Sequence, residues 1–330
     1  FDQDIMTEIM KSKFYDLSDN AYFSYLRDQG FQLQVFSNEY LNFCKVGKFE
    51  DVACNKYKYK DLSVLRKFQV STQDRAVIIG NVYLSFLNYY TWFKEIGRLA
   101  LNRGDDQAAD DISGYKALDF HFPFALGAMD ELNKLNASLE AAQPGDAYFL
   151  HMLLPHYPYL VDSACQPLPI SKWVMHRFSG NPFDGNSETT RDVRYAHYWQ
   201  QVKCTNKLMG DLVERLKGLG LYENTVLIFH GDHGSRINKI EPLFSEFERL
   251  ETMEYQDGFS TFMAVKLPGT QGQIHRESIT LTEMLSGLAA NNLRALPDFE
   301  KLNEAPPEVY LGGIIGEEFN KVPYPEEPED

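Results

Sequence analysis

The stretch GLGLYENTVLIFHGDHG, residues 218–234, carries the most informative pattern in this 330-residue chain. Its apolar run TVLIFH at 225–230 is bounded by turn residues on both sides, which is typical of a buried strand in a sheet covered on both faces. The strand leads into Asp232 and His233, which stand between two glycines that let the backbone approach a bound group closely. The stretch therefore predicts a strand with a candidate site at its carboxyl end.

Further apolar runs surround this strand. AYFLHMLL at 147–154 and TFMAVK at 261–266 are short and bounded by turn residues, and FQLQVF at 31–36 alternates apolar and polar residues. A helical pattern at 200–221 precedes the strand at 225–230. Strands that alternate with helices join through right-handed parallel crossovers. We therefore expect an α/β fold with a mostly parallel central sheet flanked by helices.

Polar side chains follow two of these predicted strands. His156 comes shortly after the run at 147–154, and Asp232 and His233 come directly after the run at 225–230. Ligands of open α/β sheets gather at the carboxyl ends of the strands. Carboxylate oxygen and imidazole nitrogen both suit Zn²⁺ or Mn²⁺, but a catalytic zinc has three protein ligands and only two are visible. An Asp-His-Gly turn alone is a weak signal, and its place at a strand end favours a metal site over an ordinary turn.

These residues resemble the sulfatase-like branch of the alkaline phosphatase superfamily, which includes sulfatases, phosphoethanolamine transferases and lipoteichoic-acid synthases. That branch has a late strand ending in Asp-His-Gly and an earlier strand followed by His-x-Pro-aromatic, here GDHG at 231–234 and HYPY at 156–159. The Asn-Thr lead-in at 224–225 and FMAVKLPGTQG at 262–272 also match. The resemblance runs from about residue 22 to residue 288 and is closest to membrane-anchored bacterial members.

The resemblance implies a role for each site residue. Asp232 and His233 would be ligands of a divalent metal ion, with Mn, Zn, Ca and Mg not distinguished, and His156 would contact a sulfate or phosphate ester. Arg236 would contact the anion, an ordinary surface arginine being the alternative. His230 lies on the same side of its strand as Asp232 by alternation, so it is a candidate to support the ligands from behind. The implied mechanism is a two-step displacement through a covalent enzyme ester.

One part of the family pattern is missing. Family members begin with a strand that delivers acidic ligands and a helix that opens with a Thr, Ser or modified Cys nucleophile, and nothing before Asn20 matches this. A near match to the sulfatase cysteine motif at 165–169 lacks its arginine and follows His156, so we interpret Cys165 as structural. The chain starts at Phe1 without a Met or a basic signal sequence, and we therefore expect the nucleophile and a membrane anchor upstream.

The cysteines bear on the compartment. Four cysteines allow three pairings. The short spacing of Cys44 and Cys54 favours a local disulfide, which leaves Cys165 with Cys204. The alternative is four ordinary buried thiols in a cytosolic protein. Paired cysteines fit the extracytoplasmic location, periplasm or cell surface, that the resemblance implies.

Residues 76–93, AVIIGNVYLSFLNYYTWF, carry no charge and are nearly long enough to span a bilayer. Polar interruptions favour a buried, aromatic-rich helix over an interfacial helix, and a true span is the least favoured reading. The formal net charge of −15 excludes a general nucleic-acid binder. We expect a sulfatase-like α/β domain at 1–315 without its first strand, and an acidic, proline-rich tail at 316–330, whose residues 322–330 form a disordered end or a linker.

Three functions are therefore considered. The first is a metal-dependent sulfatase-like hydrolase or transferase that acts on a sulfate or phosphate ester, with a glycan or lipid headgroup as the partner. The second is a non-catalytic domain of the same family that binds anionic glycan or lipid headgroups. The third is a metal-dependent mutase or phosphodiesterase, which ranks lowest because only His275 follows His233 as a further histidine ligand.

Overall fold

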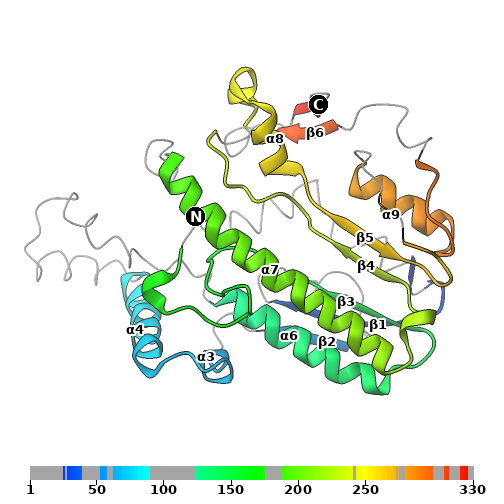
Figure 1. Ribbon diagram of the computed structural model, residues 1–330, viewed down its shortest axis with the longest axis horizontal. Helices are drawn as coiled ribbons and strands as arrows, with labels where there is room; N and C mark the ends of the chain where they lie inside the picture. Colours follow the sequence, from blue (N-terminus) through cyan, green and yellow to red (C-terminus); the bar gives the residue numbers. More distant parts are fainter. Residues whose placement is uncertain are drawn as a thin grey trace, which may run out of the picture. The chain divides into compact units, whose positions relative to one another are not determined.

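The computed structural model describes residues 25–26, 28–38, 53–57, 62–89, 123–174, 188–240, 243–272, 274, 279–299, 308–311 and 320–325. Figure 1 labels the helices and strands along the chain. The chain forms two compact units. The first comprises Phe1–Met175 with His197–Met209, and the second comprises His176–Ala196 with Gly210–Asp330.

The first unit contains a three-stranded parallel sheet in the order β2-β1-β3. β1 is Gln32–Asn38, β2 is Ala53–Tyr57 and β3 is Asp146–Leu150. Leu33 and Val35 of β1 are buried, as the alternating pattern at 31–36 predicts. The apolar run at 147–154 is a strand only over its first part: the His151 N–H makes a last hydrogen bond to the Phe36 carbonyl of β1 at 2.9 Å, and residues 152–154 leave the sheet ahead of two prolines that cannot donate ladder hydrogen bonds.

Helices pack on this sheet and on one another. They are α3 (Val64–Lys67), α4 (Thr72–Tyr89), α6 (Phe124–Ser138), the 3₁₀ turn η3 (Leu139–Ala141) and the 3₁₀ turn η4 (Ile170–Lys172). α6 contacts all three strands. Ile78 of α4 is fully buried in the core of this unit and Val77 packs against that core, whereas Ile79 is exposed; the expectation of a buried, aromatic-rich helix over 76–93 stays a prediction for the later residues. In the described parts of the chain, no helix combines the length and apolar character needed to cross a membrane.

The long helix α7 spans Glu188–Gly218. It begins well before the predicted start at residue 200. The segment 188–199 contains no proline or glycine, so nothing in it breaks the helix. The helix supplies residues 197–209 to the first unit and residues at both of its ends to the second.

The second unit contains the strand of the central motif. β4 (Leu227–His230) follows the 3₁₀ turn η5 (Tyr222–Asn224) and pairs with β5 (Met263–Lys266). The pairing is antiparallel, with His230 opposite Met263, and it differs from the expected parallel crossover. The connection between the two strands, residues 231–262, includes η6 (Phe244–Arg249) and α8 (Thr252–Phe259). It leaves β4 and enters β5 at the same end of the pair, so the two strands run in opposite directions.

Helix α9 (Leu281–Ala290) covers these two strands. It begins with a capping box, in which the Thr280 hydroxyl accepts from the Glu283 N–H at 3.2 Å and Glu283 accepts from the Thr280 N–H at 3.1 Å. Met284 and Leu288 of the helix pack with the strand residues Ile228 and Val265. This apolar layer fixes β4, and with it the start of the Asp-His turn.

Two short segments near the carboxyl terminus form a small sheet. β6 (Glu308–Leu311) pairs antiparallel with β7 (Asn320–Pro323). Val322 is 5% exposed and packs with Tyr255 and Leu311, so the expectation of a disordered tail is wrong over β7. The apolar side chain of Val322 has a core to enter, and this outweighs the proline-rich composition around it.

Candidate functional site

The Asp-His turn begins directly after β4. The Nε2 atom of His233 lies 3.6 Å from Oδ2 of Asp232, and their side chains are 26% and 73% exposed. Nδ1 of His233 lies 2.7 Å from the Gly234 carbonyl oxygen. A carbonyl only accepts hydrogen bonds, so the proton sits on Nδ1 and the lone pair on Nε2, beside the Asp232 carboxylate. An imidazole nitrogen and a carboxylate oxygen, both atom types that bind divalent metal ions, thus lie next to each other.

The electrostatics of the turn keep this imidazole neutral. Burial lowers the pKa of His233, and the nearby positive charge of Arg236 lowers it further, against the smaller opposing effects of Asp232 and the Gly234 carbonyl. A neutral imidazole keeps the Nε2 lone pair that metal binding requires.

Neighbouring atoms lie close to both glycines of the turn, where a side chain would stand. A Cβ at Gly234 would lie 2.3 Å from the backbone oxygen of Asp257, and a Cβ at Gly231 would lie 2.0 Å from the hydroxyl oxygen of Thr261. Gly234 donates its N–H to the Gly258 carbonyl at 3.2 Å. The clash at Gly234 involves backbone, which cannot rotate away, so the turn and α8 fit only without a side chain there.

Asp257 of α8 holds the residues that follow the turn. Its Oδ1 accepts from the Ser235 hydroxyl at 2.9 Å, and its backbone oxygen accepts from the Arg236 N–H at 2.8 Å. Its Oδ2 accepts from the Tyr195 hydroxyl and lies 3.6 Å from the Arg191 guanidinium. Sequence reasoning did not find these supports, because a contact between residues 195 and 257 leaves no local pattern.

Arg236 and His230 border the turn. Arg236 is exposed, has a backbone φ of +53°, and lies near enough to His233 to lower its pKa. His230 is exposed and its Nδ1 lies 3.0 Å from the Gly231 carbonyl oxygen. The anion-binding role of Arg236 and the supporting role of His230 both stay predictions.

His156 belongs to the first unit, in the loop that follows β3. Its ring stacks on Tyr157 with centroids 4.2 Å apart and meets the edge of Phe124 at 6.4 Å. Its Nδ1 is hydrogen-bonded to the Tyr157 carbonyl, so the proton sits on that nitrogen. Asp232 and His233 belong to the second unit, and the two parts of the candidate site are therefore described separately.

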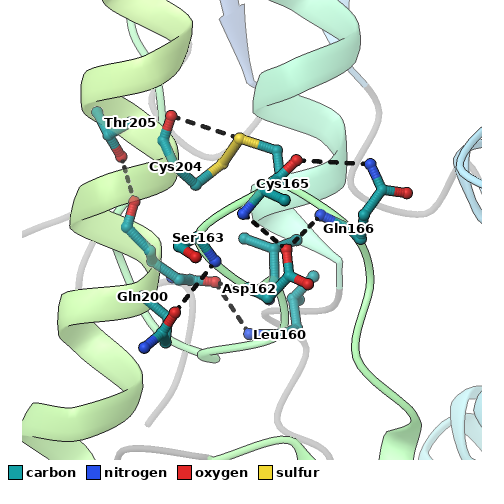
Figure 2. The surroundings of a disulfide bond; sticks show 11 residues. Leu160, Asp162, Ser163, Cys165, Gln166, Gln200, Cys204 and Thr205 are labelled. Carbon is teal, nitrogen blue, oxygen red and sulfur yellow. Dashed lines mark hydrogen bonds between the residues drawn. A yellow bond between two sulfur atoms is a disulfide. The ribbon is translucent and has the colours of Figure 1, made fainter.

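Cys165 and Cys204 are joined by a disulfide bond in the structure, with Cα atoms 5.0 Å apart (Figure 2). The bond links the loop after His156 to α7. The proposed partner pair, Cys44 with Cys54, cannot be compared, since Cys44 lies outside the described residues.

The donor set at the turn fits part of a metal site. Within the described residues, no three side chains of His, Cys, Asp or Glu come together to hold an ion. Asp232 and His233 supply one carboxylate and one neutral imidazole, which suit a divalent cation and leave further ligands to be supplied from elsewhere.

Comparison with known proteins identifies this chain as a member of the alkaline phosphatase superfamily. The model of the Sulfatase family matches residues 19–289, and the chain belongs to this family.

Two curated relatives illustrate the similarity. Lipoteichoic acid synthase 1 of Bacillus subtilis is 23% identical over 205 residues, covering 61% of this chain and 28% of that protein. Lipoteichoic acid synthase of Staphylococcus aureus is 23% identical over 209 residues, covering 62% of this chain and 28% of that protein. The match thus spans less than a third of either relative. No solved structure gives a significant match.

Proposed function

We propose that this chain belongs to a metal-dependent hydrolase or transferase that acts on a sulfate or phosphate ester. The observation that carries the proposal is the turn itself, where Nε2 of His233 and Oδ2 of Asp232 lie 3.6 Å apart on a family motif. A divalent ion bound there would act as a Lewis acid on an ester oxygen. The proposal includes one mostly parallel central sheet that contains β4.

The residues of the chain have separate tasks in this proposal. Asp232 and His233 hold the ion, and Arg236 offers a positive charge to the ester. His156 donates to an ester oxygen, and because its Nδ1 proton is engaged by the Tyr157 carbonyl, donation from Nε2 requires the imidazolium form. An approaching anion favours that form. His156 would then stabilise charge on the ester oxygens in the transition state.

The covalent step requires a nucleophile, which we place upstream of Phe1. Its oxygen would form a bond to phosphorus or sulfur while the leaving-group oxygen departs with the bonding electrons and takes up a proton. Water in a hydrolase, or an acceptor alcohol in a transferase, would then attack the same atom and release the enzyme oxygen. The relatives named lipoteichoic acid synthases make a lipid-linked phosphate ester the first substrate class to test.

We also propose an extracytoplasmic location, periplasm or cell surface, with a membrane anchor upstream of Phe1. The Cys165–Cys204 pair supports this, since disulfides persist in oxidising compartments.

Metal binding by the intact protein tests the site. Calorimetric titration of MnCl₂ and ZnCl₂ into chelator-treated protein is expected to show one site whose affinity falls in Asp232→Asn and His233→Gln. The loss should exceed the roughly 10- to 100-fold that is typical when only a group behind a ligand is changed. Asp192→Asn, an exposed aspartate of the same unit, is the matched control. Unchanged affinity in both site variants would refute the assignment.

Turnover separates the enzyme from a non-catalytic binding domain. The intact protein is expected to cleave p-nitrophenyl sulfate or bis-p-nitrophenyl phosphate in the presence of the ion, and preference between the two identifies the ester. Binding of either anion with no turnover and no covalent adduct would favour the non-catalytic alternative.

A further inference from the structure

Gln201 of α7 places its side chain inside the loop that carries His156. The residue is fully buried, at 0% exposure. Its Nε2 donates to the backbone carbonyls of Pro155 at 3.1 Å and of His156 at 2.9 Å. Its Oε1 accepts from the N–H of Leu160 at 2.9 Å and of Val161 at 3.4 Å. One side-chain amide therefore serves four backbone groups of one loop.

The loop depends on this amide because it has little regular structure. Residues 151–158 form no helix or strand, and prolines at 155 and 158 remove two backbone donors. Buried backbone carbonyls and N–H groups need partners, and Gln201 provides them on both sides of His156. Its two donated bonds end on the carbonyl of His156 itself and on that of the residue before it.

Neighbouring contacts fix the register of α7 against the loop. Cys204, almost one helical turn after Gln201, is bonded to Cys165 (Figure 2). Gln200 accepts a hydrogen bond from the Ser163 N–H at 3.2 Å. The Thr205 hydroxyl donates to the backbone carbonyl of Gln201 at 2.8 Å, within the helix. The amide of Gln201 is thus held opposite residues 155–161.

We propose that Gln201 is a positioning residue for His156. It fixes the backbone of the loop on both sides of the imidazole and so sets where Nε2 lies relative to the ester. This inference rests on the proposed function, in which His156 contacts the ester. Gln201 itself touches no reacting atom.

The substitution Gln201→Glu is the sharpest test. It keeps the length and the acceptor of Leu160 and Val161, but it replaces the donating nitrogen with an oxygen that faces two carbonyl oxygens. Gln200→Glu is the matched control, since it is the adjacent residue of the same type and keeps its acceptor toward Ser163. We expect kcat/KM of Gln201→Glu on a chromogenic ester to fall by about 10- to 100-fold, with Gln200→Glu within about twofold of wild type.

A double-mutant cycle distinguishes positioning from a general loss of structure. If Gln201 acts through His156, Gln201→Glu has no further effect on kcat/KM in a His156→Ala background, whereas a global defect would multiply with it. The Mn²⁺ affinity of Gln201→Glu should match that of wild type. Full multiplication of the two effects, or wild-type kcat/KM in Gln201→Glu, would overturn the positioning role.

Hydrogen exchange provides a readout that does not depend on activity. Gln201→Met removes all four hydrogen bonds, so the amides of Leu160 and Val161 should exchange at least about tenfold faster than in Gln200→Glu, which keeps its acceptor toward Ser163. Equal exchange in the two variants would show that Gln201 does not hold the loop. Wild-type kcat/KM in His156→Ala would instead refute the proposed role of His156 while leaving the exchange result to stand.

Discussion

The phenol of Tyr195 donates a hydrogen bond to the carboxylate of Asp257, and this joins α7 to the helix that supports the Asp-His turn. The same carboxylate receives the Ser235 hydroxyl, two residues after His233. Burial, together with the hydrogen bond and charge of Asp257, raises the pKa of Tyr195 to about 12. Tyr195 therefore helps to hold Asp257, which in turn holds the residues that follow the candidate metal-binding turn.

The stability that this phenol contributes should depend on pH in a defined window. The pKa of Tyr195 in the folded protein lies above its ordinary value of 10.0, so its stabilising effect is complete below pH 10 and is lost as the pH rises toward 12. Tyr195→Phe is expected to unfold at lower urea concentration than wild type at pH 8, and the difference should shrink between pH 10 and 12. Tyr222→Phe is the control, because Tyr222 uses its ring face toward Lys217 and Lys266. A difference that grows with pH would contradict the assignment.

A side chain at Gly234 should disrupt the turn. In Gly234→Ala the new Cβ meets the backbone of Asp257, and we expect lower thermal stability together with weaker Mn²⁺ binding. Gly210→Ala is the control, since its Cβ would meet nothing within 4 Å on α7. That change should stabilise the protein by about 0.5–1 kcal/mol through helix propensity. Equal metal affinity in both variants would show that the turn tolerates a side chain.

We expect Lys266 to contribute to the stability of the fold and not to ion binding. Its ammonium donates to the backbone carbonyls of Tyr222, Glu223 and Thr225, where it closes the 3₁₀ turn that precedes β4. Lys266→Met leaves these carbonyls without their charged donor and should lower the melting temperature, with unchanged ion affinity. The exposed Lys203→Met should leave both unchanged. A loss of ion binding without a loss of stability would instead assign Lys266 to the site.

The Cys165–Cys204 bond should form in protein made in an oxidising environment. Alkylation without reductant, followed by mass spectrometry, is expected to leave both cysteines unlabelled. Removal of the bond by Cys165→Ser with Cys204→Ser should cost about 2–4 kcal/mol of unfolding free energy, because a loop of 39 residues is no longer closed. Labelling of both thiols in such material would contradict the structure here and the proposed location.

The sequence predicts the elements that have a local signal. The apolar run at 225–230 predicts a strand because turn residues bound it on both sides, and the structure has β4 there. The Asp-His turn follows from residue types alone. The start of α7 was missed because Ser187 and the residues after it resemble a loop in composition, while no helix breaker follows them. The return of β5 antiparallel to β4 was missed because strand direction depends on the path of 231–262, which periodicity does not report.

The supports of the site could not be predicted. Asp257 and Tyr195 are 62 residues apart, and Gln201 lies 45 residues from His156. Each is a polar residue in a helical stretch, where composition suggests a solvated face. Only the tertiary fold buries Gln201 and turns it toward backbone groups, so local patterns assign such residues to the surface.

The antiparallel pairing of His230 with Met263 also bears on how this domain can change over evolution. The segment 231–262 begins and ends at paired residues at the same end of β4 and β5, so its length can change without changing how the two strands pair. Insertions or deletions between Asn238 and Glu251 add little closure entropy and leave the strand register untouched. The sequence of this segment can therefore vary next to the Asp-His turn while the two glycines and Asp257, which shape the turn, stay in place.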